Sequence, residues 1–269
     1  MNTSTSTVST QQSLLTGSAL CLQMDDTTIL DKVSICVNPG EMIGLIGPNG
    51  AGKSSLLSML AGLTVPTSGS VLFNSTRLST MPAQQRARDI GWLEQIGQIH
   101  WPLSVYRLVS LGRFPHQATW QTPNAEDEQA VAQALSNTHC SHLADRDVTT
   151  LSGGERARVL LARVLAAKPK LILADEPVSA LDLGHQLQSM SVLRTFARGE
   201  QACVVVLHDL SLAARFCDRL YLLDQGLLVS EGTAAHVLTN DNIRNVYGVE
   251  VISGCDDIPW IVPHSLTAL

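Results

Sequence analysis

The run between residues 47 and 54 contains the side chains with the clearest chemistry. It reads Gly47-Pro48-Asn49-Gly50-Ala51-Gly52-Lys53-Ser54 and fits the pattern GxxxxGK[ST]. Glycines let the backbone wrap closely enough for its amides to point at phosphate oxygens, and the amino end of a following helix adds positive potential. Lys53 is expected to reach the β- and γ-phosphates and Ser54 to ligate Mg²⁺, so the run predicts a nucleotide-phosphate site.

Two adjacent acids end a second apolar run, Leu171-Ile172-Leu173-Ala174-Asp175-Glu176-Pro177. A parallel strand would bring both acids to the carboxyl edge of the sheet, where the phosphate loop also lies. Asp175 is the candidate to orient Mg²⁺ through water, and Glu176 to polarise an attacking water. His208 follows the next apolar run, and a right-handed crossover places it at the same edge, near the γ-phosphate. The catalytic candidates are therefore Glu176, His208 and Lys53.

A third motif, Leu151-Ser152-Gly153-Gly154-Glu155, precedes an apolar helical run that ends near Ala166. Ser152 and Glu155 match the S-x-x-E capping box. The two glycines would leave exposed amides at a helix amino end, which makes a second anion site in the same chain.

The elements that position these motifs predict an α/β fold with a parallel sheet. Short buried strands are expected at 42–46, 171–174, 202–207 and 219–223, and helices at 54–63, 124–135, 155–166 and 183–196. From about residue 96 to 165 the sequence changes to aromatic-bearing loops and helix, which predicts an inserted helical subdomain. Residues 1–18 are predicted to be a disordered tail, followed by a single domain at 19–269.

Composition excludes several classes of protein. The 269 residues are 45% hydrophobic and 16% charged, and the formal net charge of −6 argues against nucleic acid as a partner. Six cysteines are scattered without a CxxC pair, which is typical of reduced thiols in the cytoplasm. We find no run long and apolar enough to span a bilayer, so any membrane role would need a partner. The sequence His139-Cys140-Ser141-His142 matches no standard zinc spacing and is interpreted as structural.

From about Leu20 to Gly248 the sequence resembles the ATP-binding subunits of ABC (ATP-binding cassette) transporters. Six motifs occur in the order of that family, namely GPNGAGKSS as Walker A (ending at Ser55), Gln95 as the Q-loop glutamine, LSGGE as the signature, LILADEP as Walker B, Ser179-Ala180-Leu181-Asp182 as the D-loop and His208 as the switch histidine. The resemblance implies a P-loop NTPase (RecA-like) core with a mainly parallel sheet, an antiparallel β region near the N-terminus and an inserted α-helical subdomain.

The resemblance also implies ligands and partners. ATP would be bound by residues 47–55 together with Gln95, Asp175, Asp182 and the signature residues Ser152, Gly153, Gly154 and Glu155. Mg²⁺ would be held by Ser54, Gln95 and Asp175. In the family two subunits pack head to tail, so that the signature of one caps the ATP of the other. Integral membrane permease subunits would bind near residues 95–111, and a periplasmic or extracellular binding protein would act indirectly, which implies a peripheral location on the cytoplasmic side of the cell membrane.

Three stretches are most similar to importers of ferric siderophores, haem or cobalamin, namely residues 111–116, 207–215 and 246–248. An ABC ATPase for another cargo, a soluble ABC ATPase and a nucleotide-gated regulatory module remain alternatives. The sequence departs from the family where Met24 stands in place of the aromatic residue that stacks on adenine. That substitution implies looser base selectivity.

Overall fold

The central sheet is built from the apolar runs that the sequence singled out. The computed structural model describes residues 13–94, 101–118, 122–179, 181–255 and 259–266. Within these ranges the central strands follow the order β10-β9-β3-β8-β7-β6, with bounds β3 (Met42–Ile46), β6 (Ile90–Leu93), β7 (Leu171–Ala174), β8 (Ala202–Val206), β9 (Arg219–Asp224) and β10 (Leu227–Gly232). Pairs from β9 to β6 are parallel, while β10 pairs antiparallel with β9. The predicted parallel core is confirmed.

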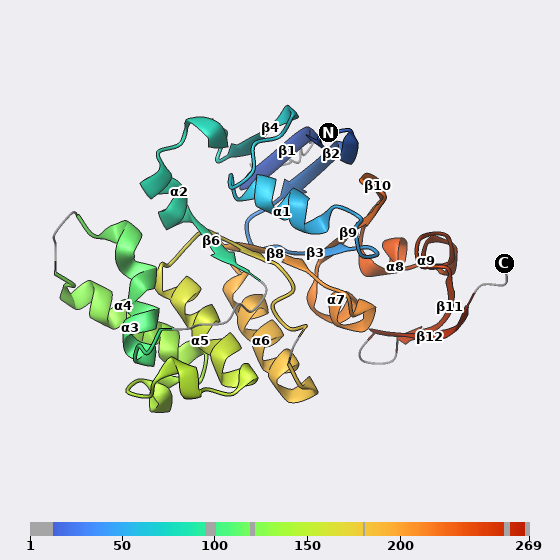
Figure 1. Cartoon of the computed structure of the whole chain (residues 1–269). Coiled ribbons are helices and arrows are strands. Elements are labelled where there is room, and N and C mark those ends of the chain that lie inside the picture. The colour runs from blue at the N-terminus through green and yellow to red at the C-terminus, as the bar shows by residue number, and fades with distance from the viewer. Residues whose placement is uncertain (1–12, 95–100, 119–121, 180, 256–258, 267–269) are drawn as a thin grey trace, which may run out of the picture.

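Both faces of this sheet are buried, which explains its continuous apolar runs. Side chains alternate along a strand, so Met42 and Ile46 of β3 face one hydrophobic core while Ile43 and Leu45 face another. In Figure 1 the helices α5 (Gly153–Ala166) and α6 (Leu183–Phe196) lie below the sheet and α1 (Lys53–Leu60) lies above it.

An antiparallel sheet near the N-terminus covers α1, as the resemblance implied. Its order is β2-β1-β4-β5, with bounds β1 (Leu15–Met24), β2 (Thr27–Val37), β4 (Ser68–Phe73) and β5 (Thr76–Arg77). The start of β1 at Leu15 corrects the predicted tail, whose boundary at residue 18 is too late. Leu15 is fully buried and pairs with Val37 and Phe73, because the Ser/Thr-rich composition continues past the point where the chain enters the core.

The region between β6 and β7 is helical. It contains α3 (Val105–Ser110), α4 (Ala125–Asn137) and α5. Arg113 joins two of these helices, because its guanidinium donates to Oδ1 of Asp127 at 2.7 Å and to the carbonyl of Ala166 at 3.0 Å. The segment around Arg113, singled out above as importer-like, therefore has a structural role in this chain. The division of the chain into a nucleotide-binding core and an inserted subdomain at about residues 96–165 stays a prediction.

The remaining elements complete the layers around the sheet. They are the helices α2 (Ala83–Asp89), α7 (Leu210–Phe216), α8 (Ala234–Val237) and α9 (Asn240–Tyr247), the 3-10 helices at Leu78–Thr80, Leu111–His116, Ser141–Leu143 and Val148–Thr150, and the C-terminal strands β11 (Val249–Cys255) and β12 (Pro259–Leu266). Strands β11 and β12 pair into a hairpin, which is fastened to α7 by hydrogen bonds between the Ser211 hydroxyl and the backbone of Ile261. No helix in the described ranges has the length and apolar character needed to cross a bilayer.

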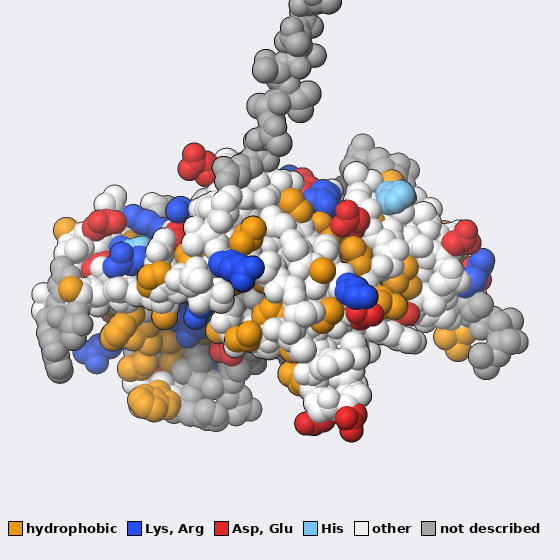
Figure 2. Space-filling view, turned by 90° about the horizontal axis from the view of Figure 1, so that it is seen from above, with side chains coloured by type: hydrophobic (Ala, Val, Ile, Leu, Met, Phe, Trp, Pro, Cys, Tyr) orange, Lys and Arg blue, Asp and Glu red, His pale blue; other side chains and the backbone are white. Residues whose placement is uncertain are grey.

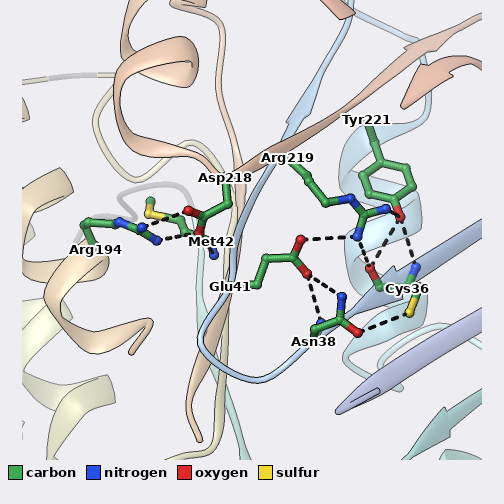
Figure 3. Close-up of polar contacts among 8 residues, drawn as sticks. All are labelled: Cys36, Asn38, Glu41, Met42, Arg194, Asp218, Arg219 and Tyr221. Atoms are coloured by element: carbon green, nitrogen blue, oxygen red, sulfur yellow. Dashed lines mark hydrogen bonds and ion pairs between the residues drawn. The ribbon is translucent and has the colours of Figure 1, made fainter. Parts of the chain in front are cut away.

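The amino edge of the central sheet holds a network of paired charges (Figure 3). Glu41 precedes β3 and accepts a hydrogen bond from Arg219 at 3.2 Å, and Arg219 also donates to the hydroxyl of Tyr221 at 2.8 Å. Asp218 precedes β9, and its carboxylate accepts hydrogen bonds from both terminal nitrogens of Arg194. Each charge in this network is paired with a group on another element, so the network holds strand starts in register.

The outer surface carries charges of both signs. On the face that Figure 2 shows, basic and acidic side chains are interspersed, and no continuous basic stripe crosses that face. This distribution agrees with the formal net charge of −6.

Candidate active site

The phosphate loop connects β3 to α1 through a backbone that two glycines make possible. Gly47 has a φ of +146°, and a Cβ there would lie 2.1 Å from the carbonyl oxygen of Leu223. Gly52 precedes α1 with a φ of +94°, and a Cβ there would press on Leu30. Both glycines are therefore required for the loop to close against β9 and β2. Between them, Asn49 and Gly50 are exposed.

Lys53 lies inside this loop. Its side chain is buried, and Nζ donates to the carbonyl oxygens of Gly47 and Pro48, each at 2.8 Å. Burial lowers the pKa of Lys53, while the nearby carboxylates of Glu176 and Asp175 oppose that shift. The ammonium group is thus placed at the centre of the loop, where it can exchange carbonyl partners for phosphate oxygens.

Ser54, the second residue of α1, forms a hydrogen bond with Asp175, the first residue after β7. The Ser54 hydroxyl donates to Oδ1 of Asp175 at 3.1 Å, although the two residues are 121 positions apart. Burial raises the pKa of Asp175, and the hydrogen bond from Ser54 opposes this rise. A hydroxyl and a carboxylate oxygen at hydrogen-bond distance are a donor set that suits a hard cation such as Mg²⁺. Gln95, the third predicted ligand, lies outside the described residues.

Glu176 and His208 form a pair at the same sheet edge. Nε2 of His208 hydrogen-bonds Oε1 of Glu176 at 2.5 Å. Glu176 has a φ of +47°, a left-handed conformation that a non-glycine residue adopts at a cost and that is often found at functional sites. Asp209, the residue after His208, caps the amino end of α7, because its carboxylate accepts hydrogen bonds from the amides of Ser211 and Leu212. This cap holds the backbone next to His208 in place. The predicted meeting of Glu176, His208 and the phosphate loop at one edge is therefore seen.

The signature motif begins α5 with the predicted capping box. The Ser152 hydroxyl accepts from the Glu155 amide, and the Glu155 carboxylate accepts from the Ser152 amide at 2.8 Å. The hydrogen bond from the Ser152 amide lowers the pKa of Glu155. Ser152 and Gly153 are exposed. Within one molecule these exposed signature residues form no hydrogen bond to the phosphate loop in the described ranges.

The D-loop residue Asp182 contacts a residue that the sequence analysis did not select. Oδ1 of Asp182 accepts the backbone amide of His185 at 2.9 Å, and Oδ2 binds Nδ1 of the same histidine at 2.8 Å. No sequence signal marks His185, because the capping box has Glu or Gln at the third helical position. The ring of His185 lies against Gly154 of the signature, which only the three-dimensional arrangement reveals.

A second residue that the sequence analysis left without a role is Tyr247, at the end of α9. Its hydroxyl is buried beside the backbone of Gly47, the first glycine of the phosphate loop. Burial raises the pKa of Tyr247 to about 12, although the Gly47 backbone opposes the rise. Helix α9 therefore packs against the phosphate loop through Tyr247.

Two further segments were singled out in the sequence, namely the predicted permease contact near residues 95–111 and the stretch at residues 139–142. Four large hydrophobic side chains between residues 101 and 114 are exposed, namely Trp101, Tyr106, Leu111 and Phe114. Around His139 and His142, and elsewhere in the described part of the chain, no group of three or more His, Cys, Asp or Glu side chains is arranged to hold a metal ion.

The chain is similar in sequence to known proteins over most of its length. A family model described as "ABC transporter" matches residues 30–179. The hemin import ATP-binding protein HmuV of Pseudomonas aeruginosa is 42% identical over 87% of this chain and 92% of its own. The cobalamin import ATP-binding protein BtuD of Halobacterium salinarum is 39% identical over 88% of this chain, which spans 59% of that protein.

Solved structures show the same fold. An inward-facing structure described as a metal-chelate type ABC transporter superposes with a TM-score of 0.82 at 28% identity, covering 94% of this chain and 97% of the other. A dimeric post-hydrolysis ATP-binding cassette bound to ADP and phosphate superposes with a TM-score of 0.71 at 26% identity, covering 82% and 98%. The fold is that of a P-loop NTPase, and on the family match and the identity to these relatives the chain belongs to the ABC transporter family.

Proposed function

We propose that this chain is the ATP-binding and ATP-hydrolysing subunit of an ABC importer. One observation carries the proposal. The phosphate loop, the Ser54–Asp175 pair and the Glu176–His208 pair all stand at the carboxyl edge of one sheet. A phosphate cradle, a cation site and a carboxylate base are the parts that hydrolysis of a nucleoside triphosphate requires.

Each residue has a distinct part in the proposed reaction. Glu176 accepts a proton from a water that attacks the γ-phosphorus, and the bond to the β–γ bridging oxygen breaks. His208 holds the Glu176 carboxylate in position through their hydrogen bond. Lys53 balances charge that builds on the phosphate oxygens. Ser54 and Asp175 would hold Mg²⁺, which would supply positive charge to the β- and γ-phosphates.

The functional unit is proposed to be a head-to-tail dimer of two copies. Each chain carries two anion sites that no hydrogen bond joins in the described residues, and head-to-tail pairing brings the signature of one copy to the phosphate loop of the other. Residues 152–155 then complete the site of the partner, and Asp182 faces the same interface. The dimeric state of the cassette with ADP and phosphate supports pairing of two copies.

Membrane permease subunits are the proposed partners on the helical side of the chain. The exposed side chains of Trp101, Leu111 and Phe114 provide apolar area of the kind that marks protein contacts. Through such a contact the chain would work at the cytoplasmic face of the membrane, and a periplasmic or extracellular binding protein would deliver cargo to the permease.

The proposed cargo is an iron complex, either a ferric siderophore or haem, or cobalamin. Support comes from the relatives named for hemin and cobalamin import and from the metal-chelate type transporter that shares the fold. The ATPase subunit does not itself hold cargo, so an ABC transporter for another cargo is the alternative.

The variant Glu176→Gln tests the proposed activity. It keeps the size of the side chain but removes the base, so steady-state phosphate release should fall by about 10²–10⁴-fold while ATP binding is retained. The matched control is Glu200→Gln, because Glu200 is exposed and precedes β8 at the opposite sheet edge. Full phosphate release by Glu176→Gln would contradict the proposal.

A further inference from the structure

The ring of His185 occupies the space next to the second glycine of the signature. A Cβ built on Gly154 would lie 2.8 Å from Nδ1 of His185, 2.9 Å from its Cγ and 3.0 Å from its Cε1. All three atoms belong to the same ring, and separations below 3.0 Å between a Cβ and another heavy atom are essentially never seen in real structures. The ring of His185 therefore lies against the amino end of α5.

Gly154 lacks any other local reason to be glycine. Its φ is not among the positive values of the chain, so an L-residue could adopt its backbone conformation. The neighbouring Gly153 differs, because a Cβ there would meet nothing within 4 Å. Within one chain, a side chain at position 154 would therefore meet the ring of His185, whereas position 153 faces open space.

His185 is in turn held by the D-loop. Its Nδ1 and its backbone amide both bind the carboxylate of Asp182, at 2.8 and 2.9 Å. Because a carboxylate only accepts, Nδ1 is the donor. A second contact joins α5 to α6, because Nη1 of Arg158 on α5 donates to the Gln188 side chain on α6 at 3.4 Å.

We propose that His185 is a positioning residue that clamps the D-loop to the signature, so that both elements move as one body. The inference rests on the proposed head-to-tail dimer, in which these two elements are what each copy presents to the nucleotide of the other. A clamp between them makes the two contacts with the partner form and break together.

The effect of Gly154→Ala with and without the His185 ring tests the clamp. Gly154→Ala should lower kcat by about tenfold, the factor that 1.4 kcal/mol of misplacement represents. Adding His185→Ala removes the ring that the new methyl group meets, so the double variant should be as active as His185→Ala alone rather than about tenfold less active. A double variant about tenfold less active than His185→Ala would overturn the proposal.

Two controls separate a positioning role from a general structural one. Gly153→Ala makes no contact with His185, so its effect should be the same with His185 and in the His185→Ala background. His185→Asn keeps a side-chain nitrogen able to donate to Asp182, so it should retain more activity and a Hill coefficient nearer that of the wild type than His185→Ala. Equal behaviour of the Asn and Ala variants would contradict the hydrogen-bonding part of the clamp.

Thermal unfolding of the same variants distinguishes failure of the clamp from failure of the proposed function. The contact lies within one chain, so Gly154→Ala should lower Tm by about 2–4 °C when His185 is present but not in the His185→Ala background, even in a protein without measurable ATPase activity. This dependence on His185, seen in a chain that does not hydrolyse ATP, would contradict the proposed function alone. An equal effect of Gly154→Ala in both backgrounds and in both assays would contradict the clamp.

Discussion

The two edges of the central sheet use charged residues in opposite ways. At the amino edge, Glu41 pairs with Arg219 and Asp218 pairs with Arg194, so the charges are satisfied within the chain. At the carboxyl edge, the bonds that the described residues give the Lys53 ammonium are to backbone carbonyls, and burial raises the pKa of Asp175. Saturated ion pairs hold strand starts in place, whereas the Lys53 ammonium can exchange its carbonyl partners for a ligand. Substitutions at the two edges should therefore have opposite consequences.

Lys53→Met should cause the largest loss of function with no loss of stability. Lys53 is expected to give phosphate charge-assisted hydrogen bonds worth about 1.5–3 kcal/mol each, so ATP affinity should fall by about a hundredfold or more. Tm should not fall, because a buried cation is replaced by an apolar side chain of similar shape. Calorimetric titration with ATP measures the affinity, with Lys170→Met as the control at an exposed position. Unchanged ATP affinity would contradict the assignment of ligand binding to the carboxyl edge.

Glu41→Ala at the amino edge should lower stability without lowering activity. It leaves the half-buried Arg219 guanidinium without its opposite charge and the amide of Asn38 without its acceptor, so the free energy of unfolding should fall by about 3 kcal/mol. kcat per folded molecule should stay at the wild-type value. Urea denaturation measures the loss, and Glu200→Ala in the exposed turn before β8 should leave stability unchanged. A fall in kcat with unchanged stability would contradict the assignment of this edge to structure.

Asp127 gives a pH-dependent test in the helical region. Burial alone would raise its pKa, but hydrogen bonds from Arg113 and from the Asn124 loop hold the pKa below the ordinary value. Its contribution to stability is therefore complete above about pH 4 and is lost as the pH falls through the folded-state pKa. The stability difference between wild type and Asp127→Asn should shrink between pH 7 and pH 3, as measured by urea midpoints.

The neighbouring exposed Glu128 provides the control for that titration. Glu128→Gln should track the wild type across the same pH range. A stability difference for Asp127→Asn that stays constant with pH would show that the Arg113–Asp127 pair does not titrate as described.

Arg194→Ala should have the smallest effect at the amino edge. Its bond to Asp218 is bidentate, but both side chains are about one-third exposed, so the loss should be about 1 kcal/mol or less. The shift should also diminish in high salt, which a comparison of urea midpoints at low and high ionic strength would measure. A loss as large as that of Glu41→Ala would mean that burial does not govern the strength of these pairs.

Most of the fold could be predicted because local signals and burial agree. Strands β3 and β7 and helix α6 have the predicted bounds, since short apolar runs mark buried strands and Asp182 caps the helix. The start of β1 was predicted too late, because Ser and Thr also occur in strands whose alternate positions are buried. Composition alone does not distinguish such a strand from a tail.

Contacts between distant residues could not be predicted. Motif spacing indicated that Glu176 and His208 would meet, because both follow parallel strands. No spacing rule connects Gly154 with His185 or Glu41 with Arg219, which meet only through the packing of separate elements. The sequence therefore indicated the ligand-binding edge far better than the network that supports the opposite edge.

The most direct test of the proposed importer is uptake of labelled ferric siderophore, haem and cobalamin by cells that lack the protein. We predict that uptake of one of these compounds is lost and is restored by the wild type but not by Glu176→Gln. Unchanged uptake of all three compounds would contradict the proposed cargo, and restoration by Glu176→Gln would contradict ATP hydrolysis at the carboxyl edge as the source of energy.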